Sequence, residues 1–205
     1  MFELSTPHPR FHRSFLEAAD EFLAVGEERY AKLLAWPADE TFPGIEFTRE
    51  ALESPDVFAE YAAFVASQSR DDAPRPSNYV AATERWMVAD GEYVGSISLR
   101  HTLTDLLLTW GGHIGYSVRP SARRRGHASR ALALMLPLCA ERGIDPVLVT
   151  CDTDNVGSRR TIEKNGGVYE DTREDKLRYW VPTRPERPFD VKTSRLEGEN
   201  LTPRR

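Results

Sequence analysis

Apolar residues in the first third of the chain recur at intervals of three and four positions, which predicts helices. We expect residues 11–36 to be helical, with a buried stripe that is interrupted at Gly26. The stripe consists of Phe11, Phe15, Ala18, Ala19, Phe22 and Leu23, followed by Tyr30, Leu33 and Leu34. A second helix is predicted to begin at Ser54, a candidate N-cap, because Pro55 and Asp56 follow it. The polar, proline-rich residues 70–78 form a connection.

The middle of the chain predicts strands. Residues 80–89 and 92–100 flank Asp90 and Gly91, which together are a strong signal for a two-residue hairpin turn. Residues 113–118 predict a further strand that ends before Pro120. Residues 103–112 show no clean period, and a strand, a short helix or a loop over a cleft all remain possible there.

Helices and strands alternate in the last part of the chain. Residues 125–142 predict a helix with one apolar face and Gly143 as its C-terminal cap. Pro137 lies inside this helix and predicts a bend or an early end, since proline removes a helix hydrogen bond. Strands are expected at 147–151 and 177–181, with a short helix at 158–165 between them. This succession is an α/β pattern, and the upstream hairpin favours a mixed sheet over a purely parallel one.

Composition limits the class of protein. The chain has 205 residues, of which 40% are hydrophobic, and its mean hydropathy is −0.51. We expect a single domain over residues 1–183, with a tail at 184–205 that is extended or disordered. There is no apolar run of about 20 residues and no apolar signal core, so we expect a cytoplasmic protein without a membrane segment. Cys139 and Cys151 are then two ordinary reduced thiols.

Residues 118–130 concentrate positive charge in a chain whose formal net charge is −5. Five arginines, Gly126 and small residues stand between a predicted strand and a predicted helix. Free amides at a helix start, the helix dipole and nearby arginines together suit a phosphate-bearing cofactor. The dipole supplies only about 0.3–1 kcal/mol for an exposed anion, so we expect the arginines to carry much of the binding. The mild net acidity argues against a nucleic-acid partner.

The motifs of this segment separate it from other phosphate-binding loops. Neither Gly-Lys-Ser/Thr nor Gly-x-Gly-x-x-Gly is present, so a nucleotide triphosphatase and a dinucleotide fold are unsupported. Arg123-x-x-Gly126-x-Ala128 resembles the acetyl-CoA loop of the GNAT acyltransferases. The downstream residues 147–152, Asn155, Ser158 and 163–167 are also similar to that family. The strings 100–101, 111–116 and 150–152 are similar to a branch of uncharacterised predicted acetyltransferases, and the resemblance covers about residues 80–181.

The resemblance implies a mixed, mostly antiparallel twisted sheet with flanking helices, in which two parallel strands splay apart and pantetheine lies between them. The N-terminal helices at 11–69 would cover the acceptor side of a coenzyme A-binding core at about 80–181. The co-substrate acetyl-CoA would contact Tyr116, Ser117, Val118, Arg123, Arg124, Arg125, Gly126, His127, Ala128, Ser129, Asn155 and Ser158. Arg119 and Arg130 are further candidates for its 3′-phosphate, and Asn155 could instead only cap the following helix.

Two histidines and two tyrosines are candidates for proton transfer. His113 and His101 are placed by the resemblance on strands that border the acceptor cleft, and a histidine base is suited to neutral pH. A structural role for each histidine is about as well supported. Many relatives use a tyrosine to return a proton to the departing thiolate, but that position matches Ile162 here. Tyr116 and Tyr169 are possible substitutes, and a packing role for Tyr116 is at least as well supported. His101 and His113 lack further ligands at usual spacings, so no metal is expected.

The expected activity is direct transfer of acetyl from acetyl-CoA to an amine, with a small molecule as the default acceptor. A strand amide near Tyr116 or Ser117 would polarise the thioester carbonyl. Two alternatives remain: a catalytically silent acyl-CoA-binding sensor, and an interaction protein whose arginine loop binds an acidic partner or RNA. A homodimer is possible, and the sequence does not determine it.

Overall fold

A seven-stranded sheet organises residues 1–184, which are the residues that the computed structural model describes. Its strands, in spatial order, are β1 (Phe2–Ser5), β4 (Ala82–Ala89), β5 (Glu92–Arg100), β6 (Ile114–Val118), β7 (Val147–Asp152), β9 (Lys176–Val181) and β8 (Val168–Arg173). Neighbouring strands are antiparallel except β6 and β7, which are parallel. The sheet is therefore mixed and mostly antiparallel, with one parallel pair, as predicted.

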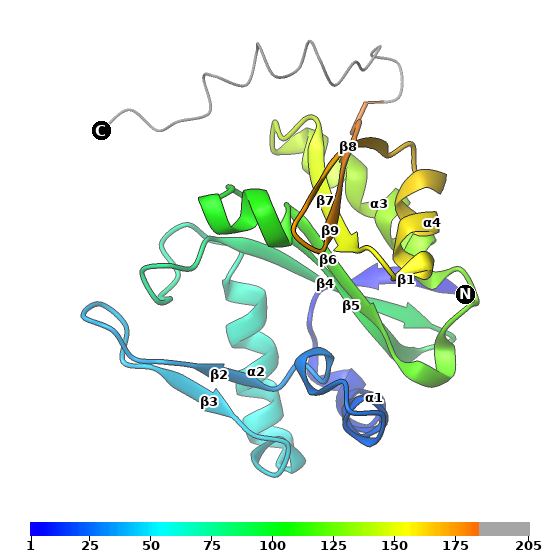
Figure 1. Ribbon diagram of the computed structural model, residues 1–205. Coiled ribbons are helices and arrows are strands. Elements are labelled where there is room, and N and C mark those ends of the chain that lie inside the picture. The colour runs from blue at the N-terminus through cyan, green and yellow to red at the C-terminus, as the bar shows by residue number, and fades with distance from the viewer. Residues whose placement is uncertain (185–205) are drawn as a thin grey trace.

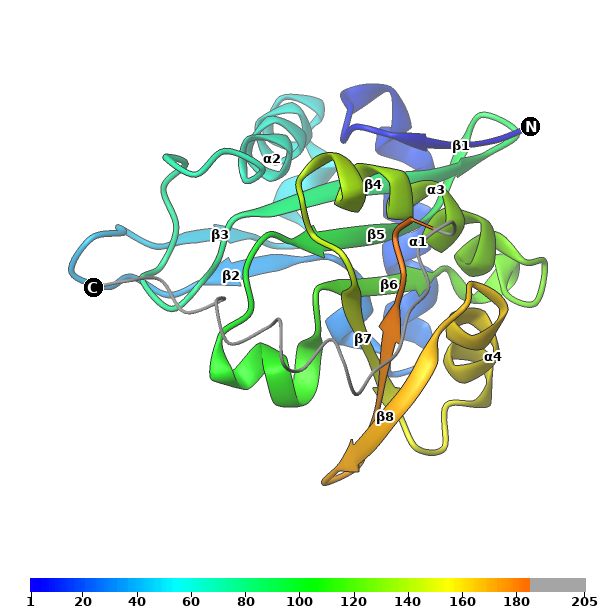
Figure 2. The ribbon, with the colours of Figure 1, turned by 90° about the horizontal axis from the view of Figure 1, so that it is seen from above.

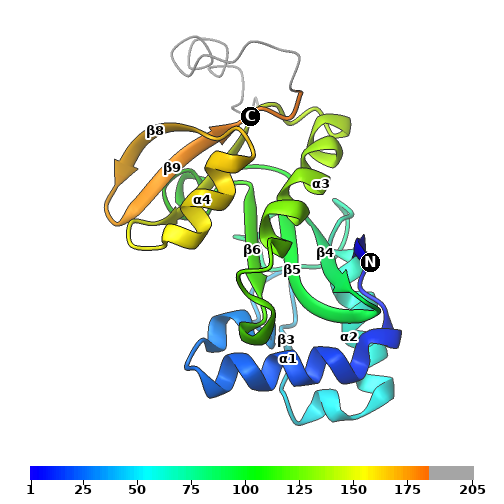
Figure 3. The same cartoon turned by 90° about the vertical axis from the view of Figure 1, so that its right-hand side faces the viewer.

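Helices cover both faces of the sheet. Helices α1 (His12–Ala24) and α2 (Pro55–Ser67) lie on one face, and α3 (His127–Glu141) and α4 (Val156–Lys164) lie on the other (Figures 1 and 3). Alternate strand residues feed two cores: Met87, Ile97 and Leu99 pack with α3, whereas Trp86 and Val88 pack with α1 and α2. No described helix is both long and apolar enough to cross a bilayer.

The helix predicted over residues 11–36 is wrong beyond Ala24. Gly26 adopts φ +71°, which ends α1, and a single 3-10 turn follows at Glu28–Tyr30. The chain then enters β2 (Leu34–Trp36), which pairs with β3 (Ile45–Phe47) in a small separate hairpin. Three-residue strands are too short to show a period of two, so the helical spacing of Leu33 and Leu34 was misleading.

The undetermined segment 103–112 is a π-helical turn, Leu107–Gly111, followed by a left-handed glycine. The guanidinium of Arg100 donates from Nη1 to the carbonyl oxygens of Gly111 and Gly112, at 2.9 and 3.1 Å. A Cβ at Gly112, whose φ is +61°, would lie 2.5 Å from the carbonyl oxygen of Leu148. Glycine is therefore required where this turn meets β7.

Helix α3 does not end at Pro137, so the expected early end is wrong. The helix continues to Glu141 and closes with bonds from Gly143 N–H to the Ala140 carbonyl and from Ile144 N–H to the Cys139 carbonyl. These two bonds are a Schellman cap, and they confirm the role predicted for Gly143. Burial of Leu132, Met135 and Cys139 against the sheet offsets the bond that proline cannot make.

Strands β6 and β7 touch at their beginnings and then part. Their register contains one residue pair, Ile114 with Val149, and His113 N–H donates to the Leu148 carbonyl at 2.7 Å. Viewed from above, β4, β5 and β6 run side by side while β7 and β8 turn away at a steep angle (Figure 2). The sheet therefore opens between β6 and β7.

Gly95 is required by the close approach of β5 to β6. Its φ is +152°, and a Cβ there would lie 2.2 Å from the Ser117 carbonyl oxygen. We expect Gly95→Ala to lower the free energy of unfolding by more than about 3 kcal/mol, measured by urea denaturation. The control is Gly91→Ala, since Gly91 also has positive φ but has no heavy atom within 4 Å of a built Cβ. Only the conformational cost of about 1–2 kcal/mol applies there, so equal losses in the two variants would contradict the packing argument.

His113 makes the stability of the β6–β7 junction depend on pH. Its Nδ1 accepts from Leu148 N–H at 2.9 Å, and burial followed by the Arg100 charge lowers the pKa of His113 to about 4. The unfolded chain therefore binds this proton near pH 6.5 and the folded chain only near pH 4. Stability from this site is complete above pH 6.5 and is lost as the pH falls towards 4.

We expect His113→Gln, whose amide oxygen can still accept from Leu148, to remove this dependence. The difference in unfolding free energy between wild type and variant should shrink by about 2–3 kcal/mol between pH 7 and pH 4.5. Urea denaturation at three pH values measures it. Parallel pH profiles for the two proteins would show that His113 is not the group that titrates.

Candidate active site

A cleft of about 1080 Å³ opens where β6 and β7 separate. One end is formed by the turn between β6 and α3 and by the start of α4, and the other end by the segment after α1 and by the π-helical turn. The lining residues used below are Lys32, Ser98, Arg100, Trp110, Gly115, Tyr116, Ser117, Val118, Arg123, Arg124, Gly126, His127, Ala128, Ser129, Asp152, Asn155, Ser158 and Lys176. The cleft therefore joins the predicted cofactor loop to the face covered by α1 and α2.

The loop before α3 presents main-chain amides to the cleft. Arg124 and Gly126 both have positive φ, +63° and +81°, and they turn the chain sharply into the helix. The first bond inside α3 runs from Arg130 N–H to the Gly126 carbonyl. The amides of His127, Ala128 and Ser129 precede that bond, so the helix itself does not use them. Together with the helix dipole they form an anion-binding site.

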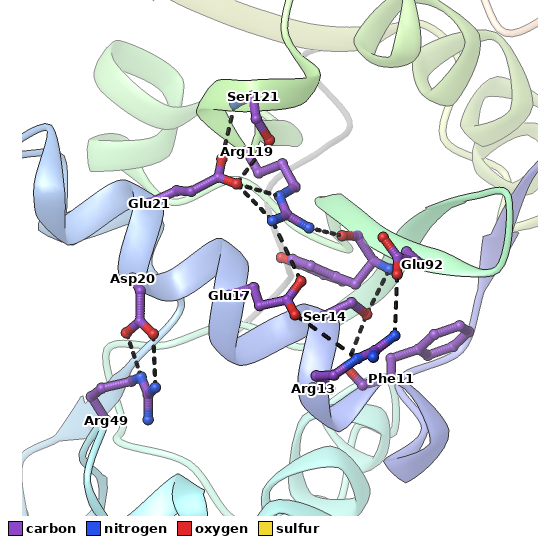
Figure 4. Close-up of polar contacts among 11 residues, drawn as sticks. Phe11, Arg13, Ser14, Glu17, Asp20, Glu21, Arg49, Glu92, Arg119 and Ser121 are labelled. Carbon is purple, nitrogen blue, oxygen red and sulfur yellow. Dashed lines mark hydrogen bonds and ion pairs between the residues drawn. The ribbon is translucent and has the colours of Figure 1, made fainter.

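Two of the loop arginines are held by glutamates, one on α1 and one just after it. Arg119 bonds Glu21 at 2.6 Å, and Glu21 also accepts from the amide and hydroxyl of Ser121 (Figure 4). Arg123 forms two bonds with Glu27, at 2.9 and 2.5 Å, which hold the pKa of Glu27 below its usual range. The structure therefore pairs the charges of Arg119 and Arg123 with glutamates, while Arg124, which also lines the cleft, makes no such pair among the described residues.

Neighbouring side chains fix the rest of the loop. The ring of His127 stacks on Phe2 at 5.3 Å, and its Nδ1 is buried without a partner among the described residues. Ser129 accepts from the side-chain amide of Asn165 at 3.2 Å. Arg130 lies over the Phe2 ring at 5.0 Å, and Arg125 stands directly before Gly126, the N-cap of α3. Strand β1, which the sequence did not predict, therefore supports the phosphate loop.

The main chain of β6 has one edge that faces the opening. Arg100 N–H donates to the His113 carbonyl and Arg119 N–H donates to the Val94 carbonyl. Main-chain groups alternate along a strand, so residues 115 and 117 also face β5. The amides and carbonyls of Tyr116 and Val118 therefore point towards β7, where the two strands are no longer paired.

Tyr116 and the start of α4 meet across the opening. The phenol oxygen of Tyr116 lies 2.7 Å from Ser158 Oγ, and burial raises the pKa of this hydroxyl strongly, so it is protonated at all working pH values. Asn155 caps α4 by accepting from Ser158 N–H at 3.0 Å. Ile162, one helical turn after Ser158, is buried. Tyr116, on β6, thus places a hydroxyl against α4 at Ser158, one turn before Ile162.

The two candidate histidines are not among the residues that line the cleft. His113 is turned towards β7 and accepts a main-chain hydrogen bond there, so its Nδ1 lone pair is occupied. His101 Nε2 lies 2.8 Å from the Thr83 hydroxyl, and burial and nearby Arg142 lower the pKa of His101. The structure brings Tyr116, Asn155 and Ser158 together with the loop, and it leaves both histidines outside this group.

Side chains to which the sequence assigned no role occupy the far end of the cleft. They are Lys32 after α1, Ser98 and Arg100 on β5, Trp110 in the π-helical turn, Asp152 at the end of β7 and Lys176 on β9. Only their position in the fold unites them, since they are spread over 145 positions of sequence from the first to the last. Arg100 and Asp152 stand in the strings that carry the family resemblance, and nothing in the sequence marked the other four.

Thiol and metal chemistry are weakly supported by the described residues. Burial raises the pKa of the Cys151 thiol to about 11 and that of Cys139 to about 12, so both stay protonated near neutral pH. Within residues 1–184, no three His, Cys, Asp or Glu side chains gather to hold a metal ion.

Comparison with known proteins identifies the family. The model of the acetyltransferase (GNAT) domain matches residues 22–168. A search of curated proteins finds no match. Similar solved structures include the microcin C7 self-immunity acetyltransferase MccE in complex with acetyl-CoA and AMP, with TM-score 0.56 and 12% identity over 88% of this chain and 92% of that one.

Two further similar structures are those of acetyltransferases named for ribosomal proteins. The RimL ribosomal L7/L12 alpha-N-protein acetyltransferase in complex with coenzyme A has TM-score 0.54 and 15% identity over 87% of this chain and 92% of its own. The ribosomal-protein-S5-alanine acetyltransferase from Vibrio fischeri has TM-score 0.55 and 12% identity over 91% and 96%. At these identities the likeness shows the fold alone. The family match covers most of the chain, and the protein therefore belongs to the GNAT acetyltransferases.

Proposed function

We propose that this acetyltransferase moves the acetyl group of acetyl-CoA directly onto the amine of a small-molecule acceptor. The observation that carries the proposal is one continuous cleft, which runs from the free amides at the start of α3 to the unpaired edge of β6. Coenzyme A has the matching shape, with a diphosphate at one end and a thiol at the end of a flexible arm.

The diphosphate would lie on the amides of Arg124 to Ala128, with Ser129 beside it. Main-chain N–H groups suit this role because they are fixed by the turn and carry no counter-ion. Arg124, Arg125 and Arg130 are the loop arginines available for the 3′-phosphate, since Glu21 and Glu27 hold the other two. Asn155 and Ser158 would border the cofactor on the α4 side.

The pantetheine arm would pair with the exposed edge of β6, between Tyr116 and Val118. Of the two amides considered for the oxyanion, Tyr116 N–H is favoured, because Ser117 faces its partner Ser96 on β5. A main-chain donor fixed in a sheet costs no reorganisation when negative charge develops on the thioester oxygen.

The acceptor nitrogen would attack from the face covered by α1 and α2. Its lone pair forms the new bond to the carbonyl carbon, and the carbon–sulfur bond breaks with its electron pair on sulfur. The Tyr116 hydroxyl donates a hydrogen bond to that sulfur, and the proton lost by the acceptor nitrogen restores the thiol. The cations at this end of the cleft lower the pKa of an ammonium group placed among them, so a dedicated histidine base is not required.

An added carboxylate at the start of α3 tests the diphosphate site. We expect Ala128→Glu to raise the dissociation constant of coenzyme A at least about tenfold, because the new charge repels phosphate at the helix start. The helix itself is not destabilised, since an acid in the first turn is favourable. The control is Ala128→Gln, with similar size and no charge, and isothermal calorimetry measures both. Equal affinities for the two variants would place the diphosphate elsewhere.

Removal of one hydroxyl tests the role of Tyr116. We expect Tyr116→Phe to lower kcat by roughly 100-fold while the KM for acetyl-CoA stays close to that of the wild type. Ser158→Ala removes the partner of the phenol but keeps the donor, and should lose less. Thiol release under saturating acetyl-CoA measures both variants. A Tyr116→Phe enzyme with the wild-type kcat would leave Tyr116 as a packing residue only.

A further inference from the structure

The far end of the cleft carries an excess of positive charge. Arg29, Lys32, Arg100 and Lys176 line it. Lys32 bonds Glu84 at 3.0 Å, Arg29 and Lys176 both contact Asp152, and Lys176 also contacts Asp175 at 3.2 Å. Four cationic side chains thus meet three carboxylates, in a chain whose formal net charge is −5.

Arg100 is the cation without a carboxylate. Among the described residues none forms an ion pair with it, and its Nη1 donates to two main-chain carbonyls. Its Nε and Nη2 make no hydrogen bond within residues 1–184, and these two donors lie on the same side of the guanidinium. Burial lowers the pKa of Arg100, as expected for a cation that its surroundings do not fully compensate. One bidentate face of this arginine is free.

The guanidinium of Arg100 lies over Gly115. A Cβ at Gly115 would be 3.5 Å from Nη2 and 3.6 Å from Nη1, and Gly115 is paired with Ser98 on β5, which lines the same cleft. Gly115 is also the residue directly before Tyr116, whose amide faces the opening between β6 and β7. An anion held by Arg100 would therefore lie beside the point at which the acceptor nitrogen must meet the thioester.

We infer that the acceptor is an amine that also carries a carboxylate, and that Arg100 binds this carboxylate through Nε and Nη2. The inference rests on the proposed function and adds the class of acceptor to it. A planar carboxylate matches the side of a guanidinium in two parallel bonds, and Lys32 and Lys176 add a favourable field. The positive charges of Arg100, Lys32 and Lys176 would repel an acceptor that is only cationic.

The test compares matched acceptors with the wild-type protein. The panel contains α-, β- and γ-amino acids, each beside its amide and its decarboxylated amine, and thiol release from acetyl-CoA is measured. We expect kcat/KM to be at least about tenfold higher for carboxylate-bearing members than for their neutral partners, a difference of about 1.4 kcal/mol. Equal use of the partners, preference for the neutral ones, or no acetylation of any carboxylate-bearing member would overturn the inference.

Arg100→Gln tests the residue itself. The glutamine amide can still donate to a main-chain carbonyl of the Gly111–Gly112 turn, but the positive charge and the two parallel donors, Nε and Nη2, are lost. We expect the preference for carboxylate-bearing acceptors to disappear through a rise in acceptor KM, while the affinity for coenzyme A changes less than about twofold. A preserved preference would exclude Arg100 as the binding group. The matched control is Arg85→Gln. Arg85 also donates to a main-chain carbonyl, that of Glu84, but it stands opposite Ile97 in the β4–β5 register and therefore lies on the sheet face that α3 covers, away from Arg100.

Calorimetry with coenzyme A separates two kinds of failure. If the wild-type protein does not bind coenzyme A, the proposed function fails. If it binds coenzyme A and acetylates neutral amines as well as amino acids, only the inference about the carboxylate fails.

Discussion

The parting of β6 from β7 is the feature on which the whole site depends. A parallel pair inside a sheet normally continues, because each added residue satisfies main-chain donors and acceptors. Here the pairing stops after Ile114 and Val149. Just before that pair, the His113 side chain accepts a hydrogen bond from Leu148 N–H. The edge of β6 beyond that point is left with unpaired amides and carbonyls inside the protein. We propose that the amide-containing arm of coenzyme A satisfies these groups.

The electrostatics of the loop differ from what its arginines alone indicate. Glu21 on α1 neutralises Arg119 (Figure 4), and Glu27, which follows α1, neutralises Arg123. Both pairs tie the loop to the part of the chain that covers the acceptor face. Binding of phosphate then depends more on main-chain amides than on the number of arginines. The uncompensated cation is at the other end, at Arg100, where no phosphate is expected to reach.

Signals from turns and helix caps in the sequence were reliable, whereas Pro137 did not end α3 and the spacing at Leu33 and Leu34 did not continue a helix. Contacts between distant parts of the chain could not be seen in the sequence. The Asp90–Gly91 hairpin, the turn at Gly126 and the cap at Gly143 depend on neighbouring residues, and the structure has all three. The β2–β3 hairpin was missed because its strands are three residues long. Arg100 and Lys32 could not be selected from the sequence, because their roles come from contacts with residues distant along the chain. The tail predicted at 184–205 lies, apart from Arg184, outside the described residues.

The central claim is that coenzyme A occupies both the helix start and the exposed edge of β6. An NMR titration of the isotope-labelled protein with coenzyme A tests it at single amides. The account predicts large shifts for the amides of residues 126–129 and, in the same titration, for Tyr116 and Val118, with little change at Ser117. Shifts at the loop without any at Tyr116, or shifts confined to other parts of the sheet, would contradict it.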